Sequence, residues 1–477
     1  MDVVGGIDSN CHKNIDDISS NVTQVVSATT NNIIVIEEDS AEAENEYDAL
    51  FHSKRFTKWR KNCPYLYKLL FYELFDYPSA TIQWLPYEQP KLDGSNSTIY
   101  RLLTGTHAAE KNELALLNVD IPNMKYDPSK QPTKYFDEDS GDYGGFGVFP
   151  ISGDIQPYVR ICHYGDVNKA RYMPQNSFLI ATCSSENLVL LFDYGKQPTK
   201  PNVDGICRPQ KVLQGHTDEG FALSWHPYQE GLLLTAAHDG TMRLWNFETS
   251  SPSTLNTVTP SSNLIECKSI IQPLETYHSD TNTIDDVQWH PRHAALFGTA
   301  ASDGILLISD IRSSSGASKL IKQRLPSSSS DKPSPTIQFR VKAHQGDCNS
   351  FHPLNDYALL TGSDDQTILL WDMRCLNKPV SSFLHHNGSV LQLEWCPFKS
   401  SMFSSASADS HILVWDIEIN NDDPTKSSSL IFDHAGHDEQ VPDLNWHYSK
   451  PGMIASVCAD SSIQIWIGDA VYRAINK

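Results

Sequence analysis

Residues 215–247, GHTDEGFALSWHPYQEGLLLTAAHDGTMRLWNF, contain the unit from which most of this chain is built. The stretch begins with a Gly-His pair and has three short apolar runs, around Trp225, from Leu232 to Ala236 and around Trp245. His226-Pro227 ends the first run and Asp239-Gly240 marks a tight turn, so the runs read as strands of one sheet. A sheet this small cannot bury both faces alone, and the stretch therefore predicts further copies of itself.

Copies of the stretch follow along the chain. An Asp followed six positions later by a Trp recurs, Asp303 and Ser309 share that spacing, and a His precedes each pair at His216, His278, His344, His386 and His437. The pattern resembles the WD-repeat β-propeller family, whose blades repeat about every 40–45 residues. The resemblance implies a structural role, hydrogen bonding inside each blade, for His216, Asp239, Trp245, Asp365, Trp371, Asp409, Trp415, Asp460 and Trp466.

The length of 477 residues fits one propeller of about seven blades with tails and insertions. We predict an all-β fold, a seven-bladed WD-repeat β-propeller with an N-terminal α-helix docked on its side. Residues 1–45 are predicted to be a disordered acidic tail and residues 79–477 the propeller. Residues 46–78 are predicted to be the helix, because apolar residues share one helical stripe at Phe56, Trp59, Cys63, Leu66, Tyr67, Leu70 and Leu74.

Three blades depart from the repeat. The second blade, from Val167, shows no His and Trp of the repeat kind and is predicted from strand pattern alone. The first strand of the fifth blade, in QGDCNSFHP, is expected to be about two residues shorter than its counterparts. The seventh blade has three clear strands, and its fourth must come from the C-terminal tail or from N-terminal residues such as Ile33 to Ile36.

Composition limits the classes of partner and site. A formal net charge of −21 argues against direct binding to nucleic acid and favours basic partners. The ten cysteines are spread singly without metal-ligand spacing, which indicates a reducing compartment, no metal and no cofactor. No signal peptide or membrane-spanning run is recognised, so we expect a soluble intracellular protein without membrane partners.

Several segments outside the repeats resemble one family within this class, the retinoblastoma-binding, nucleosome-remodelling-factor type of histone-binding WD protein. They include residues 56–86 (FTKWRKNCPYLYKLLFYELFDYPSATIQWLP), YGGFG at 143–147 and NKARYMPQN at 168–176. The resemblance implies a scaffold that binds histones H3 and H4 and that assembles with larger subunits of a chromatin complex. It implies a nuclear location, with a cytoplasmic location as a further possibility. It also implies a groove for the first helix of H4, formed by Leu66, Leu70, Asp422, Asp423 and Phe432.

The same resemblance implies a second site, on the face of the propeller. Converging carboxylates with an aromatic wall suit the guanidinium or ammonium group of a basic peptide. The positions that match the family are Asp76, His107, Asp166, Asn168, Glu219, Phe221, Asp285 and Asn349, whereas Ser389 and Leu391 stand where the family has an acid and an aromatic residue.

Three functions compete on the sequence. The first is a non-catalytic H3–H4 scaffold of a chromatin assembly complex, with a type B histone acetyltransferase, deacetylase or remodelling complex as its alternative. The second is a cullin ubiquitin ligase receptor, suggested by Asp310-Ile311-Arg312 and Asp372-Met373-Arg374. The third, an enzyme, is disfavoured because the recurring His and Asp fall one set per blade, and no nucleophile elbow, phosphate loop or HExxH motif occurs.

Overall fold

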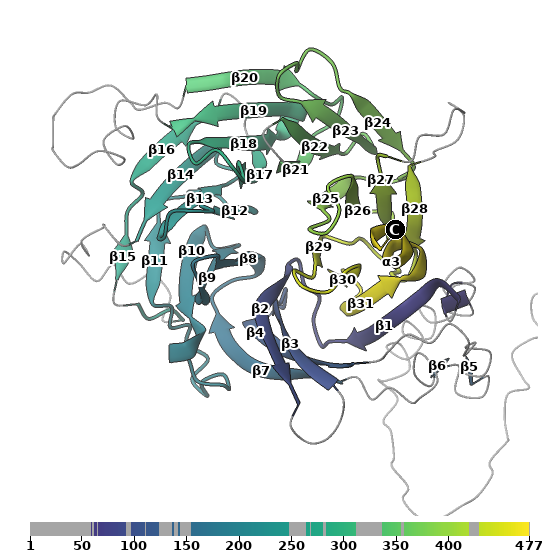
Figure 1. The fold of residues 1–477 in the computed structure, drawn as a ribbon. Coiled ribbons are helices and arrows are strands. Elements are labelled where there is room, and N and C mark those ends of the chain that lie inside the picture. Colours follow the sequence, from purple (N-terminus) through teal and green to yellow (C-terminus); the bar gives the residue numbers. More distant parts are fainter. Residues whose placement is uncertain are drawn as a thin grey trace, which may run out of the picture. The chain divides into compact units, whose positions relative to one another are not determined.

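The computed structural model describes residues 59, 62–63, 65–91, 97–109, 111–123, 136–137, 142–143, 154–247, 264–267, 269–279, 283–311, 336–353, 357–418 and 429–476. Seven antiparallel blades stand around a common axis (Figure 1), as predicted. The innermost strand of each blade contacts the innermost strands of its two neighbours, which closes the ring. In the described part of the chain, no helix is long and apolar enough to cross a membrane.

The strands of the first three blades follow one another along the chain, except that the fifth strand of the second blade comes between the last two strands of the third. The first blade comprises β2 (Ile82–Pro90), β3 (Ser97–Gly105), β4 (Asn112–Pro122) and β7 (Asp154–His163). The second comprises β8 (Val167–Met173), β9 (Asn176–Ser184), β10 (Leu188–Asp193), β11 (Lys211–Gln214) and the parallel strand β15 (Ile270–Ile271). The third comprises β12 (Ala222–Trp225), β13 (Leu232–Ala236), β14 (Thr241–Asn246) and β16 (Glu275–His278). Two short strands, β5 (Phe136–Asp137) and β6 (Asp142–Tyr143), pair separately.

The remaining blades repeat this arrangement. The fourth comprises β17 (Ile284–Trp289), β18 (Leu296–Ala301), β19 (Ile305–Asp310) and β20 (Thr336–Lys342). The fifth comprises β21 (Cys348–Pro353), β22 (Ala358–Ser363), β23 (Thr367–Asp372) and β24 (Ser381–Leu384). The sixth comprises β25 (Val390–Trp395), β26 (Met402–Ser407), β27 (Ile412–Asp416) and β28 (Leu430–His434). The seventh comprises β29 (Asp443–Trp446), β30 (Met453–Val457), β31 (Ser462–Gly468) and β1 (Tyr67–Leu74).

The seventh blade is closed by a strand that the sequence analysis assigned to a helix. Strand β1 pairs antiparallel with β31, and Leu70 lies opposite Trp466. Of the two expected sources, the C-terminal tail is incorrect, since it forms helix α3 (Asp469–Ile475). The strand comes from the N-terminal side of the propeller, but from β1; the suggested residues Ile33 to Ile36 lie outside the described residues. Pairing satisfies the backbone groups on the free edge of β31, which a docked helix would leave without partners.

The predicted N-terminal helix is therefore shorter than expected. Trp59, Cys63 and Leu66 are helical, but the chain is extended from Tyr67, so the predicted boundary at residue 78 is wrong. A spacing of three and four residues fits a helical stripe, yet Leu69 and Leu70 are both buried against the seventh blade. Tertiary pairing overrides the local pattern here because the open sheet edge offers a continuous set of hydrogen bonds.

Tyr67 anchors this segment to the last two blades. The Trp59 indole N–H donates to the Tyr67 hydroxyl (2.9 Å), which is also hydrogen-bonded to His434 Nδ1 (2.7 Å). The His434 ring stacks on Trp466 with centroids 4.4 Å apart. A Cβ atom at Gly436 would come within 2.5 Å of the Trp59 ring, so this position requires glycine.

The third, fifth and sixth blades each contain the same hydrogen-bonded set of four side chains. In the third blade, His216 Nδ1 lies 3.1 Å from Asp239 Oδ2, and Thr235 Oγ1 lies 2.8 Å from both His216 Nε2 and Trp245 Nε1. Equivalent sets are His344, Asp365, Thr361 and Trp371, and His386, Asp409, Ser405 and Trp415. In the fourth blade, where Ser309 replaces Trp, Thr299 Oγ1 has no hydrogen-bond partner among the described residues.

The second blade does contain a histidine of the repeat kind, contrary to the sequence prediction. His163, the last residue of β7, places Nε2 2.8 Å from Thr182 Oγ1, and Phe192 takes the position of the tryptophan. The fifth blade also differs from expectation, because β21 is as long as β17 and β25. The two-residue deletion instead shortens the connection between β21 and β22. A shorter connection loses fewer hydrogen bonds than a shorter strand would, because loops tolerate deletions.

Acid is expected to destabilise the protein in part through His163. Burial lowers the pKa of His163 to about 4, whereas an unfolded histidine titrates near pH 6.5. Between these values the unfolded chain binds a proton that the native state lacks. The free energy of unfolding should therefore fall as the pH falls, by up to about 1.4 kcal/mol per pH unit for this side chain.

Urea unfolding between pH 4 and 7 measures this dependence. A His163→Gln variant should show a shallower slope, and His385→Gln, which changes an exposed histidine, should keep the slope of the unmodified protein. Identical slopes in all three proteins would show that His163 is not the source.

Candidate functional site

The innermost strands of four blades each contain a bulge at their second residue. In β8, β17 and β21 the ladder skips Asn168, Asp285 and Asn349, and in β25 it skips Leu391. A bulge leaves one residue outside the regular pairing and turns its side chain in a new direction. Three of the predicted face residues therefore occupy equivalent positions, at the end of the ring where the innermost strands begin. We call this end the rim and define it by the eight residues predicted for the propeller face.

Hydrogen bonds join the rim residues of the first three blades. His107 Nε2 lies 3.1 Å from the Val167 carbonyl, and the Asn112 amide donates to Asp166 Oδ1 (2.8 Å). Asn168 Nδ2 donates to Glu219 Oε2 in the next blade (3.4 Å). The structure thus brings Asp166, Asn168 and Glu219 together, although 53 positions separate the first from the last.

A histidine that the sequence analysis did not select links the third and fourth blades. His238 Nε2 lies 3.3 Å from Asp285 Oδ1, and the His238 ring lies 4.9 Å from the Phe221 ring. The signal that could have found it is its place directly before the repeat Asp239, since Asp364 before Asp365 makes a similar rim contact. Asp364 Oδ1 accepts from Asn349 Nδ2 at 2.6 Å.

Asp76 lies apart from this continuous set. It is exposed between β1 and β2, and its charge helps to raise the pKa of Arg160, which is mainly set by the hydrogen bond of Arg160 to Glu113. It remains near the rim because the Pro78 carbonyl accepts the His107 backbone N–H at 2.9 Å. The rim as a whole carries four accessible carboxylates, the exposed Asp76 and the partly exposed Asp166, Glu219 and Asp285, and a half-buried aromatic ring, Phe221. Such a surface can pair with and stack against cationic groups.

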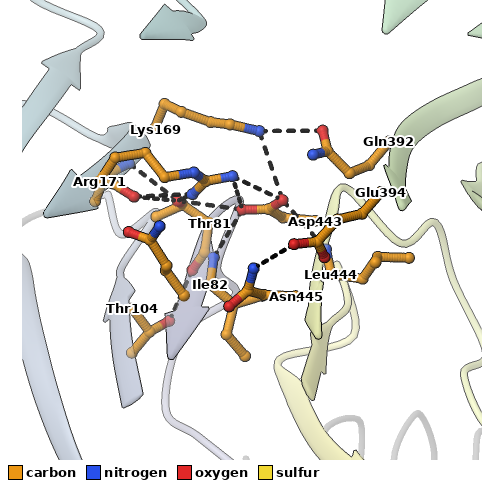
Figure 2. Close-up of polar contacts among 12 residues, drawn as sticks. Thr81, Ile82, Thr104, Lys169, Arg171, Gln392, Glu394, Asp443, Leu444 and Asn445 are labelled. Atoms are coloured by element: carbon orange, nitrogen blue, oxygen red, sulfur yellow. Dashed lines mark hydrogen bonds and ion pairs between the residues drawn. The ribbon is translucent and has the colours of Figure 1, made fainter. Parts of the chain in front are cut away.

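Beside the rim, a buried network of side chains joins the innermost strands of several blades (Figure 2). Asp443 of β29 is fully buried, and its carboxylate accepts from Arg171 Nη2 at 2.9 Å and from the Ile82 backbone N–H at 2.9 Å. Lys169 Nζ lies 3.5 Å from Asp443 and donates to Gln392 at 3.3 Å. The network joins the first, second, sixth and seventh blades, and its cations are already paired. A cationic ligand would therefore meet accessible carboxylates at the rim, whereas the Asp443 carboxylate in this network is buried and already paired.

The residues predicted for the H4 groove are only partly available. Leu70 and Phe432 are buried, with Leu70 in β1 and the Phe432 ring 5.6 Å from Trp466, so the predicted helical face with Leu70 is incorrect. Leu66, the last helical residue, is half-buried. Asp422 and Asp423 lie outside the described residues.

One cluster has the composition of a metal site but not its chemistry. His437, Cys458 and Asp460 place their ligand atoms within 4.8 Å of one another. However, His437 bonds with both ring nitrogens, to Ser456 Oγ (2.8 Å) and Ser462 Oγ (3.1 Å). Burial also raises the pKa of the Cys458 thiol, which disfavours the thiolate that a metal ion would require. The cluster is the seventh blade's version of the repeat hydrogen bonds, so we assign no metal to it.

Two family models match the chain. A model whose description names the histone-binding protein RBBP4 and the CAF1 complex matches residues 54–123, which include the N-terminal helical residues, β1 and three strands of the first blade. A second model, the WD domain, G-β repeat, matches residues 207–246, 335–372 and 377–416. The first match covers the segment whose helix and strand are not general features of a propeller. Together with seven observed blades, these matches make the chain similar to the RBBP4-type histone-binding WD-repeat proteins.

Proposed function

We propose that this protein is a non-catalytic scaffold subunit of a chromatin assembly complex, which binds histones H3 and H4 in the nucleus during nucleosome assembly. The observation that carries the proposal is the match of residues 54–123 to the histone-binding model. The rim supports it, because Glu219 and Asp285 lie beside Phe221 and form a surface suited to arginine and lysine side chains. The net charge of −21 favours the approach of basic proteins over long range.

The proposed H4 contact uses the N-terminal segment. Leu66 ends the helical residues beside the Tyr67 anchor, so an amphipathic H4 helix could place apolar side chains against a rigidly held surface. Asp422 and Asp423 remain the acids that we propose for its basic residues.

Charge reversal at the rim tests the second contact. Glu219→Lys combined with Asp285→Lys is expected to weaken binding of a basic H3-tail peptide by more than about tenfold, or 1.4 kcal/mol. The cause is repulsion where the unmodified protein offers ion pairs. Fluorescence anisotropy at fixed moderate salt measures the effect.

Glu230→Lys is the matched control for the single variant Asp285→Lys, since each changes the net charge by +2. Glu230 is exposed in the same blade but lies between β12 and β13, at the opposite end from the rim. It should leave affinity nearly unchanged. Equal losses in both variants would mean that net charge, and not the rim, governs binding.

Co-purification tests the complex. Recovery of large assembly subunits supports our assignment, whereas recovery of a catalytic acetyltransferase without them would favour the type B acetyltransferase alternative. The cullin receptor hypothesis gains no support from the one box that the structure describes in full, since Arg312 of the other box lies outside the described residues. Arg374 of the Asp372-Met373-Arg374 box donates to Asp372 (2.6 Å) and lies 4.3 Å from the Tyr357 ring centre, so its charge is used locally.

A further inference from the structure

His238 stands where the carboxylates and the aromatic ring of the rim meet. It lies in the turn between β13 and β14, and its backbone N–H donates to the Glu219 carbonyl at 3.0 Å. Its ring faces Phe221 at 4.9 Å with an interplanar angle of 31°. Its Nε2 reaches Asp285 Oδ1 of the next blade at 3.3 Å. The imidazole therefore makes the two contacts, to a carboxylate and to a ring face, that a ligand cation would make at this position.

The charges that act on His238 are all negative. The hydrogen bond to Asp285 raises the pKa of His238 above its ordinary value, and the charges of Asp285, Glu219 and Asp218 act in the same direction against the opposing effect of burial. Asp285 comes from β17, whereas Asp218 and Glu219 come from the loop before β12. The carboxylate of the neighbouring Asp239 is already hydrogen-bonded to His216, the Thr217 backbone N–H and the Thr241 hydroxyl.

Asp285 is only half satisfied by this contact. Oδ1 pairs with His238, while Oδ2 is buried and receives no hydrogen bond from any described residue. The side chain as a whole stays 24% exposed, and that of His238 30% exposed, so both can be reached from the rim. A carboxylate with one free oxygen favours an additional donor, and a guanidinium can supply two.

We propose that His238 is a built-in, pH-dependent competitor of the basic ligand: when protonated it occupies Asp285 and Phe221, and when neutral it yields them to an arginine or lysine side chain. This inference rests on the proposed binding of basic peptides at the rim. A protonated imidazole also adds a positive charge that repels the ligand cation. Affinity for basic peptides should thus rise with pH through the titration of His238, by up to about tenfold per pH unit. By linkage, ligand binding should release a proton from the protein.

The test uses the full-length protein and an acetylated, amidated peptide that carries arginine but no His, Asp or Glu. Isothermal titration calorimetry between pH 5.5 and 8.5, at constant ionic strength, should show affinity that increases with pH. Near the midpoint, buffers of different ionisation enthalpy should reveal net proton release. His238→Gln cannot be protonated in this range and should bind with a nearly flat profile and without proton release. His385→Gln, an exposed histidine elsewhere, should behave as the unmodified protein.

The outcomes distinguish failure of the His238 inference from failure of the proposed function. A pH slope and proton release that persist in His238→Gln would overturn the inference, as would binding by the unmodified protein with a flat profile. Absence of binding at every pH would overturn the proposed function and the inference together. A fold check by circular dichroism and thermal unfolding accompanies each variant, and His238→Asn provides a second non-titrating side chain if His238→Gln is unstable.

Discussion

Asp443→Ala is expected to lower the free energy of unfolding by about 3–5 kcal/mol. The carboxylate is fully buried and neutralises Arg171 and Lys169, whose side chains are only 16% and 12% exposed. Its removal leaves two cations with little water and without their common counter-ion. It also removes the acceptor of the Ile82 backbone N–H. Because the network joins the first two blades to the last two, the loss should reduce the stability of the closed ring as a whole.

Urea unfolding monitored by tryptophan fluorescence measures this loss. Asp372→Ala serves as control, since Asp372 pairs with Arg374 at the surface and should change stability little. Adding Arg171→Leu to Asp443→Ala should recover part of the stability, because the unpaired buried charge is then removed as well. An Asp443→Ala protein as stable as the unmodified one would show that water screens these charges.

Leu70→Asp is expected to cost at least about 3 kcal/mol, the sum of a lost buried leucine and a carboxylate placed in an apolar site. Leu70 is 4% exposed and lies opposite Trp466 in the pair of strands that closes the seventh blade. The substitution should therefore disrupt the pairing of β1 with β31, which closes the seventh blade. Weaker histone binding by this variant would report misfolding and not the loss of a contact.

Leu66→Asp is the variant that separates binding from folding. Leu66 is half-buried and precedes β1, so this change should leave thermal unfolding close to that of the unmodified protein while weakening an H4 first-helix peptide. The two variants are compared by thermal unfolding and by peptide titration. Suppose that Leu70→Asp has the thermal unfolding midpoint of the unmodified protein and that it alone loses H4 affinity. Leu70 would then be a surface contact, and its proposed role in closing the seventh blade would be wrong.

Several features could be predicted from local pattern because each has a local cause. The short apolar run from Leu232 to Ala236, with Asp239-Gly240 after it, specifies a strand and a turn. The recurring His, Asp and Trp mark equivalent places in successive sheets, as the set of His216, Asp239 and Trp245 shows. Rim residues such as Asn168 and Asp285 are instead predicted from the resemblance to the family, and the structure places each at the same point of its innermost strand.

The contacts made across the ring could not be predicted in this way. The stripe from Trp59 to Leu74 suits a helix, and only the unpaired edge of β31, some 390 positions away, draws its second half into a strand. His238 and Asp285 come from different blades, as do Arg171 and Asp443, and no spacing along the chain records either pair. Local residues thus specify each blade and its repeat, since hydrogen bonding and side-chain alternation act over a few positions. The closure of the ring, the charge of its rim and its buried ion pairs arise where distant strands meet, because those energies depend on distances that exist only after folding.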